Sequence, residues 1–266
     1  MLTFSPLNYL GRLGNQLFEI FSVIAEAKKR NTGWLFPHWT YKDYVNIPSE
    51  WFGDDLSECE DICQSYYQDW NNFEHLKDLI FQTITPTNLI ADEINTLRNE
   101  WMPPGSEYIG IGIRRTDYLN SLHLYPPINL SYYQNGIDFI KKQRSDKQIK
   151  VVCFSDDIEW CKQNIQCDIY ESGNQISILK LILMSKCDHF IIANSTFHWW
   201  GAYLGSHPNK IVIYPMRWLG PGVSNKHLFN LFYPTWYGFT GSNGQLINSP
   251  HQINVNIWDA SNREDF

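Results

Sequence analysis

The sequence has no excess of positive charge and no long hydrophobic run. Its 266 residues carry 21 lysines and arginines against 28 aspartates and glutamates, for a net charge of -7. Because nucleic-acid binding needs a basic surface, we expect no nucleic acid as partner, and any phosphate site must be local. No apolar window reaches the length of a membrane span, and no signal-peptide core is visible. We therefore expect a cytoplasmic protein with no transmembrane segment.

The chain also has few motifs of metal or nucleophilic chemistry. Its six cysteines form no paired C-x-x-C knuckles and have no histidine that completes a zinc pattern, so we expect reduced thiols. There is no G-x-S-x-G elbow and no P-loop. Asp156 and Asp157 are adjacent, and adjacent residues of an extended chain point to opposite faces, so we expect no bound metal. The alternative roles for this pair are hydrogen bonding to a ribose or nucleotide base, or capping of a helix.

The hydrophobic content of 43% and the aromatic content of 15% indicate a substantial core. In the second half of the chain, short apolar segments with a strand pattern alternate with segments of helical period. Such alternation predicts an α/β fold with a doubly wound parallel sheet. The expected strands are 109–113, 149–154, 168–170, 189–193 and 211–214, and the expected helices are 132–144, 158–165, 176–186 and 197–204.

A break at Met102-Pro103-Pro104-Gly105 separates two halves of the chain. We expect an N-terminal half over residues 1–105, a C-terminal half over 106–237, and a polar tail or loop-rich extension over 238–266. The N-terminal half begins with a possible strand, Leu2 to Leu7, and a glycine loop, Gly11 to Gln16. A helical pattern follows from Asn15, so the loop amides face a potential anion, although many such loops only turn a corner.

The strand at 109–113 alternates isoleucine with glycine and ends in Arg114-Arg115-Thr116-Asp117. The carboxyl ends of parallel strands are where α/β folds bind ligands, and a guanidinium suits phosphate oxygens. An ordinary surface Arg–Asp pair is the alternative. Asn194-Ser195-Thr196 stands between the next buried strand and a helix, where hydroxyls and amides either bind phosphate or cap the helix. Together with the glycine loop, these segments favour a nucleotide diphosphate.

Residues 33–51 are rich in aromatic side chains, with His38, Trp39 and Asp43 among them. Aromatic rings with polar neighbours suit stacking against a sugar, which makes these three residues candidates for binding an acceptor. Aromatic residues also build cores, so packing is the competing interpretation.

These motifs, in this order, resemble the bacterial α-1,2-fucosyltransferase family, glycosyltransferase family 11, over about residues 7 to 237. Residues 11–18 are similar to its G-x-L-G-N-Q-x-F opening, and residues 114–118 to the H-x-R-R-x-D-Y motif of fucosyltransferases. Residues 154–157 with Trp160 resemble a second motif, and residues 194–202 resemble N-S-S-F-S-W-W-x-A.

The resemblance implies a GT-B-like fold, with two Rossmann-type halves and the donor site in the cleft. It also implies an inverting, metal-independent transfer of fucose from GDP-fucose to a galactose hydroxyl of a surface glycan, with peripheral association at membranes that carry lipid-linked glycans. Arg114 would hold the donor pyrophosphate and offset the charge of the leaving GDP. The other residues implied at the donor are Gly14, Asn15, Arg115, Asp156, Asn194, Ser195 and Thr196.

The transfer also requires a general base, for which Asp117, Asp43 and His38 are the candidates. Arg115 and Asp117 are further expected to brace the site. Two residues depart from the family pattern: Gly112 replaces the histidine of the first motif, and Lys180 replaces an aspartate. Because both positions lie near the guanine in related enzymes, a different nucleotide sugar is an alternative donor. A non-catalytic protein that binds glycans or nucleotides is the alternative from another class.

Overall fold

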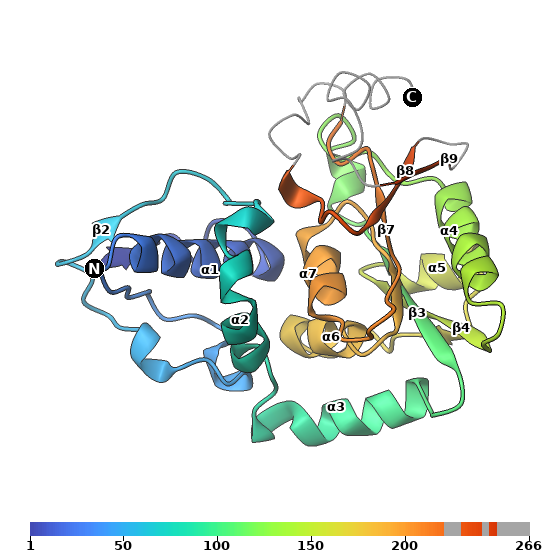
Figure 1. The fold of residues 1–266 in the computed structure, drawn as a ribbon, viewed down its shortest axis with the longest axis horizontal. Helices are drawn as coiled ribbons and strands as arrows, with labels where there is room; N and C mark the ends of the chain where they lie inside the picture. Colours follow the sequence, from blue (N-terminus) through green and yellow to red (C-terminus); the bar gives the residue numbers. More distant parts are fainter. Residues whose placement is uncertain (221–229, 241–244, 249–266) are drawn as a thin grey trace.

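The computed structural model describes residues 1–220, 230–240 and 245–248 and has an α/β fold (Figure 1). A seven-stranded sheet forms the centre of the C-terminal half, in the order β5-β4-β3-β6-β7-β8-β9. All neighbouring strands are parallel except β8 and β9. The strands are β3 (Glu107–Ile113), β4 (Ile149–Ser155), β5 (Ile169–Tyr170), β6 (His189–Ile191), β7 (Val212–Pro215), β8 (Tyr237–Thr240) and β9 (Gln245–Asn248).

Helices cover both faces of this sheet, with α4 and α5 on one side and α6 and α7 on the other (Figure 1). They are α4 (Leu130–Gln143), α5 (Ile158–Asn164), α6 (Ser177–Met184) and α7 (Thr196–Leu204). Each helix lies within two residues of its expected bounds at either end. The predicted strand–helix alternation and the doubly wound parallel sheet are confirmed.

The alternation along β3 divides its two faces. Ile109, Ile111 and Ile113 pack into the core beneath α4 and α5. Gly110 and Gly112 face the opposite side, where they meet the side chains of Cys187 and His198. Because side chains alternate across a strand, the glycines form one smooth face on which neighbouring side chains approach the backbone closely.

The N-terminal half is built around α1 (Leu13–Lys29), which is buried along almost its whole length. A two-stranded parallel sheet, β1 (Leu2–Thr3) with β2 (Glu60–Asp61), lies beside it, so the strand expected over Leu2 to Leu7 is limited to its first two residues. Two further helices follow, α2 (Lys77–Thr83) and α3 (Asn88–Trp101). The short 3-10 helices are η1 (Lys42–Tyr44), η2 (Ser49–Trp51), η3 (Trp70–Asn72), η4 (Glu74–Leu76) and, in the C-terminal half, η5 (Tyr118–Asn120).

The expected boundary at residue 105 falls between α3 and β3, and one apolar core runs across it. Phe18 of α1 packs against Trp199 and Trp200 of α7, with ring centroids 4.7 and 5.2 Å apart. Residues 237–240 and 245–248 form β8 and β9, where a loop-rich extension was expected, and residues 249–266 of that extension lie outside the described residues. No helix in the described part of the chain has both the length and the apolar character to cross a bilayer.

One carboxyl group lies inside the core of the N-terminal half. Glu19 of α1 has no exposed surface, and neither carboxyl oxygen has a hydrogen-bond partner among the described residues. Burial disfavours the charged form and raises the pKa of Glu19 from its ordinary value of 4.5 to about 9. Between these two pH values the folded chain holds a proton that the unfolded chain has released, so stability falls as pH rises.

We expect Glu19→Gln to remove this pH dependence. Relative to the variant, the wild type should lose about 1 kcal/mol of unfolding free energy for each pH unit between pH 5 and pH 8. Urea unfolding at pH 5, 6, 7 and 8 measures the difference, and Glu93→Gln, at an exposed position of α3, is the matched control. Parallel stability curves for the wild type and Glu19→Gln would contradict a protonated Glu19.

Candidate active site

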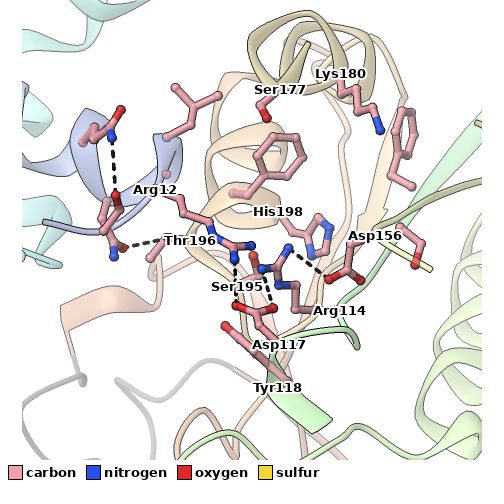
Figure 2. A pocket seen from close by; sticks show the side chains of 18 of the residues that line it. Arg12, Arg114, Asp117, Tyr118, Asp156, Ser177, Lys180, Ser195, Thr196 and His198 are labelled. Atoms are coloured by element: carbon pink, nitrogen blue, oxygen red, sulfur yellow. Dashed lines mark hydrogen bonds and ion pairs between the residues drawn. The ribbon is translucent and has the colours of Figure 1, made fainter. Parts of the chain in front are cut away.

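A cavity of about 590 Å³ lies between the two halves, at the carboxyl ends of β3, β4, β5 and β6 (Figure 2). This is the place at which parallel α/β sheets bind ligands. The N-terminal half contributes Asn8, Thr40, Tyr41, Tyr66 and residues 11–16 to its wall. The C-terminal half contributes Ile113, Arg114, Asp117, Tyr118, Tyr125, Phe154, Ser155, Asp156, Glu171, Ser177, Lys180 and residues 195–198.

Two helix N-termini meet at this cavity. A Cβ placed on Gly14, in the first turn of α1, would lie 2.5 Å from the backbone nitrogen of Phe197 in the first turn of α7. The Thr196 hydroxyl donates to Asn15 Oδ1 over 2.9 Å, and Gln68 Nε2 donates to the same oxygen over 2.9 Å. These contacts place the predicted residues Gly14, Asn15 and Thr196 together at the cavity.

The first-turn amides of both helices have no side-chain cap. The N-cap residues are Arg12 for α1 and Ser195 for α7, and neither side chain accepts a hydrogen bond from the following amides. Ser195 therefore does not cap α7 with its side chain, which was the alternative role for this residue. Uncapped amides at a helix N-terminus carry partial positive charge and bind anions.

Arg114 is held at the cavity by two carboxylates. Its guanidinium lies 2.5 Å from Asp117 Oδ1 and 3.1 Å from Asp156 Oδ2, and it sits 5.4 Å from the centre of the Tyr118 ring. Arg12 reaches the other oxygen of Asp117 over 3.3 Å. Figure 2 shows these side chains as one connected group, in which Asp117 joins the arginines of the two halves. The pair of Arg114 with Asp117 is thus part of a network that crosses the cleft, and not the isolated surface pair that was the alternative.

Arg115 points away from the cavity. Its guanidinium lies 3.2 Å from Asp157 Oδ2 and stacks 3.6 Å above the Trp160 ring. Asp156 accepts from the Arg115 amide over 2.9 Å and from the Thr116 hydroxyl over 2.5 Å, while Asp157 caps α5 by accepting from the Trp160 amide. Arg115 therefore braces the turn after β3, as expected, and is not placed to touch a donor.

Asn194 has a structural role in place of the predicted phosphate contact. It is 2% exposed and does not line the cavity. Its amide nitrogen donates to the carbonyls of Pro126 and Trp218 over 3.3 and 3.0 Å, and its own carbonyl accepts from the Tyr118 hydroxyl over 2.9 Å. Asn194 fixes the turn that presents Ser195 and Thr196.

The three residues predicted to bind an acceptor lie outside the cavity. Trp39 is fully buried, and its indole nitrogen donates to Gln16 Oε1 over 2.9 Å, which is the packing interpretation. His38 is exposed and away from the cavity wall, while Asp43 lines a separate groove. Thr40 and Tyr41, beside them in the sequence, reach the cavity instead.

Gly112 is explained by His198, which sequence reasoning did not single out. A Cβ on Gly112 would lie 2.3 Å from the imidazole Cγ of His198, so the ring occupies the space of any side chain at position 112. His198 is 4% exposed, and burial, with the nearby charge of Arg114, lowers the pKa of His198 to about 3. The motifs that this sequence resembles have histidine at the place of Gly112 and serine at the place of His198, whereas in this chain the imidazole reaches the cavity from α7.

Lys180 also proves to be a cavity residue with a defined partner. Its ammonium lies 3.1 Å from Oε1 of Glu171, which is buried, and 3.1 Å from the carbonyl of Gly173. Burial raises the pKa of Glu171, and the charge of Lys180 opposes that rise. Glu171, Ser177 and Arg12 were absent from the predicted site; only Arg12 had a sequence signal, since it lies within the glycine loop.

The described residues contain no group of three or more His, Cys, Asp and Glu side chains arranged to hold a metal ion. The two carboxylates considered for that role, Asp156 and Asp157, are engaged by Arg114, Arg115 and Thr116. Arg12, Arg114, Lys180 and the first-turn amides of α1 and α7 are the positively charged or partially positive groups at this cavity.

We expect the residues at 112 and 198 to be coupled. Gly112→Ala alone should destabilise the protein by about 1–3 kcal/mol, because the new methyl group overlaps the His198 ring. In a His198→Ser background the same change should cost less than about 0.5 kcal/mol, since the space is then open. Urea unfolding of the two single variants and the double variant gives the coupling energy. Equal effects of Gly112→Ala in both backgrounds would contradict the steric pairing.

Comparison with known proteins places this arrangement in a family. The O-antigen biosynthesis glycosyltransferase WbnK of Escherichia coli is 29% identical over 172 residues, which cover 61% of this chain and 56% of WbnK. The galactoside 2-alpha-L-fucosyltransferase SEC1 of Bos taurus is 25% identical over 245 residues, covering 85% of this chain and 63% of SEC1. The chain thus spans a little over half the length of these relatives.

Among solved structures, an Arabidopsis thaliana FUT1 variant in complex with GDP has a TM-score of 0.51 at 12% identity, with 79% of this chain and 69% of that chain covered. This likeness supports the GT-B-like fold. The sequence model of glycosyl transferase family 11 matches residues 15–239, from the first turn of α1 to β8. The chain therefore belongs to glycosyltransferase family 11.

Proposed function

We propose that this protein is an inverting glycosyltransferase that transfers L-fucose from GDP-fucose, in α-1,2 linkage, to a galactose hydroxyl of a surface glycan. The observation that carries the proposal is the convergence of two uncapped helix N-termini with Arg12 and Arg114 on one cavity. Four sources of positive charge around one space suit a diphosphate. We take fucose and a galactoside acceptor from the name of the bovine relative. We take guanine as the base of the donor nucleotide from the GDP complex of the structural neighbour.

Arg114 is the group that acts on the leaving diphosphate. In the transfer, the bond between the sugar carbon and the β-phosphate oxygen breaks, and the electron pair leaves on GDP. A guanidinium held from two sides by Asp117 and Asp156 meets that developing charge without having to reorganise. Ser195, Thr196 and the first-turn amides of α7 line the same cavity and bind the same phosphates.

The acceptor hydroxyl must lose its proton as its oxygen bonds to the sugar carbon. Of Asp117, Asp43 and His38, the three candidates for the base, only Asp117 lines the cavity. The acceptor approaches along the N-terminal half, where Asn8, Thr40, Tyr41 and Tyr66 form the wall. We place this reaction in the cytoplasm, on lipid-linked glycans at the membrane surface.

Replacing Arg114 tests the proposal directly. Arg114→Ala should lower kcat for GDP release from GDP-fucose by about 10²–10³-fold, the effect of losing one donor to a developing oxyanion. Arg115→Ala is the matched control, because its side chain stacks on Trp160 outside the cavity and its loss should change kcat far less. GDP release with a β-galactoside acceptor is the assay. No release by the wild type, or equal rates for the wild type and Arg114→Ala, would refute the proposed function.

We further expect the reaction to proceed without a divalent cation, because Arg12, Arg114 and the α7 terminus supply the charge that a metal would provide. EDTA at millimolar concentration should leave the initial rate of GDP release within about twofold, well below the effect of losing an essential catalytic group. Chelator titration with and without added Mg²⁺ or Mn²⁺ measures this. Loss of activity that Mg²⁺ or Mn²⁺ restores would show that the transfer depends on a metal.

A further inference from the structure

One region of the cavity is not used by the transfer chemistry. Glu171 follows β5, and Ser177 and Lys180 belong to the first turns of α6. Figure 2 shows Ser177 and Lys180 well separated from Arg12, Arg114 and Asp117, with His198 between the two groups. All three residues belong to the C-terminal half, whose strand ends form the nucleotide side of the cleft. Because the phosphates lie at α7 and the acceptor along the N-terminal half, this region is where we expect the nucleotide base of the donor.

The Lys180 ammonium is a positioned donor. Two of its three N–H groups are directed to Glu171 Oε1 and to the Gly173 carbonyl, each over 3.1 Å. The third has no acceptor among the residues that the structure describes, and Lys180 lines the cavity with 18% of its side chain exposed. Glu171, whose side chain is 2% exposed, fixes the ammonium in place. One charged donor is thus available to a ligand at this end of the cavity.

We propose that Lys180 reads the base of the donor nucleotide by donating its third N–H to a ring carbonyl, the O6 atom of guanine. This inference rests on the proposed function and concerns its nucleotide end. An ammonium has donors and no acceptor, so it favours a base with a carbonyl at this position over adenine, which presents an amino group there. A carboxylate at this position could only accept a hydrogen bond, so it would read the N–H groups of guanine. An ammonium and a carboxylate would therefore recognise different atoms of the same base.

The two modes of recognition make opposite predictions for inosine diphosphate. Inosine keeps the O6 carbonyl of guanosine and lacks its 2-amino group. A site that reads O6 should bind GDP and inosine diphosphate within about threefold, and ADP at least tenfold more weakly, since a lost hydrogen bond to a charged group is worth tenfold or more. A site that reads the amino group would discriminate against inosine diphosphate.

Calorimetric titration of the full chain with GDP, inosine diphosphate and ADP tests the inference. In Lys180→Met, the affinities for GDP and inosine diphosphate should fall about tenfold or more and approach the affinity for ADP. In Lys180→Asp, preference for GDP over inosine diphosphate should appear. Lys162→Met is the matched control, because Lys162 is also a helical lysine, paired with Glu159 on α5 and outside the cavity. The double variant Lys180→Met/Glu171→Gln removes the unpaired buried carboxylate and should show the same loss of base selectivity.

The outcomes separate this inference from the proposed function. An unchanged ratio of GDP to ADP affinity in both Lys180→Met and the double variant would overturn the role of Lys180, as would tenfold weaker wild-type binding of inosine diphosphate than of GDP. In either case, loss of GDP binding in Arg114→Ala would still support the proposed diphosphate site. Absence of GDP binding by the wild type would refute both proposals.

Discussion

The close approach of α1 to α7 at Gly14 determines the rest of the site. A side chain at position 14 would separate the two helix N-termini, which the Asn15–Thr196 hydrogen bond holds together. Further along α1, Phe18 packs on Trp199 and Trp200, so the same helix pair joins the cores of the two halves. Two helix N-termini meet Arg12 and Arg114 at one cavity, where Asp117 and Asp156 pair with the two arginines. Ligand binding and domain contact are thus coupled through the same few residues.

The sequence predicted the C-terminal half well because each of its elements has a clear period and a clear end. Alternating isoleucines mark β3, and apolar helices follow polar strand ends. The N-terminal half was less predictable, since most of its chain beyond α1 consists of short 3-10 helices and irregular segments held by tertiary contacts. β8 and β9 were not predicted for a related reason. Each is only four residues long, and β8 forms by pairing with β7, a contact that the polar sequence around it does not indicate.

Most residues predicted for the donor site line one cavity, and several others do not. Gly14, Asn15, Arg114, Asp117, Asp156, Ser195 and Thr196 all line the cavity. Arg115, Asn194 and Trp39 do not, because a motif gives the order of residues and not the direction in which each side chain leaves a turn. Arg114 points into the cleft and its neighbour Arg115 onto Trp160. The exchange between Gly112 and His198 joins two elements 86 positions apart in the numbering, and only their packing reveals it.

The cations of the cavity are each held by a carboxylate. Asp117 pairs with Arg12 and Arg114, Asp156 with Arg114, and Glu171 with Lys180. This pairing fixes the donors before a ligand arrives, so binding requires little ordering of long side chains. The net charge of the whole chain, -7, does not describe this cavity. At physiological ionic strength charges beyond about 8 Å are screened, so the local groups and not the total charge decide what enters. The acidic surface then disfavours other polyanions while the cleft remains selective for a small one.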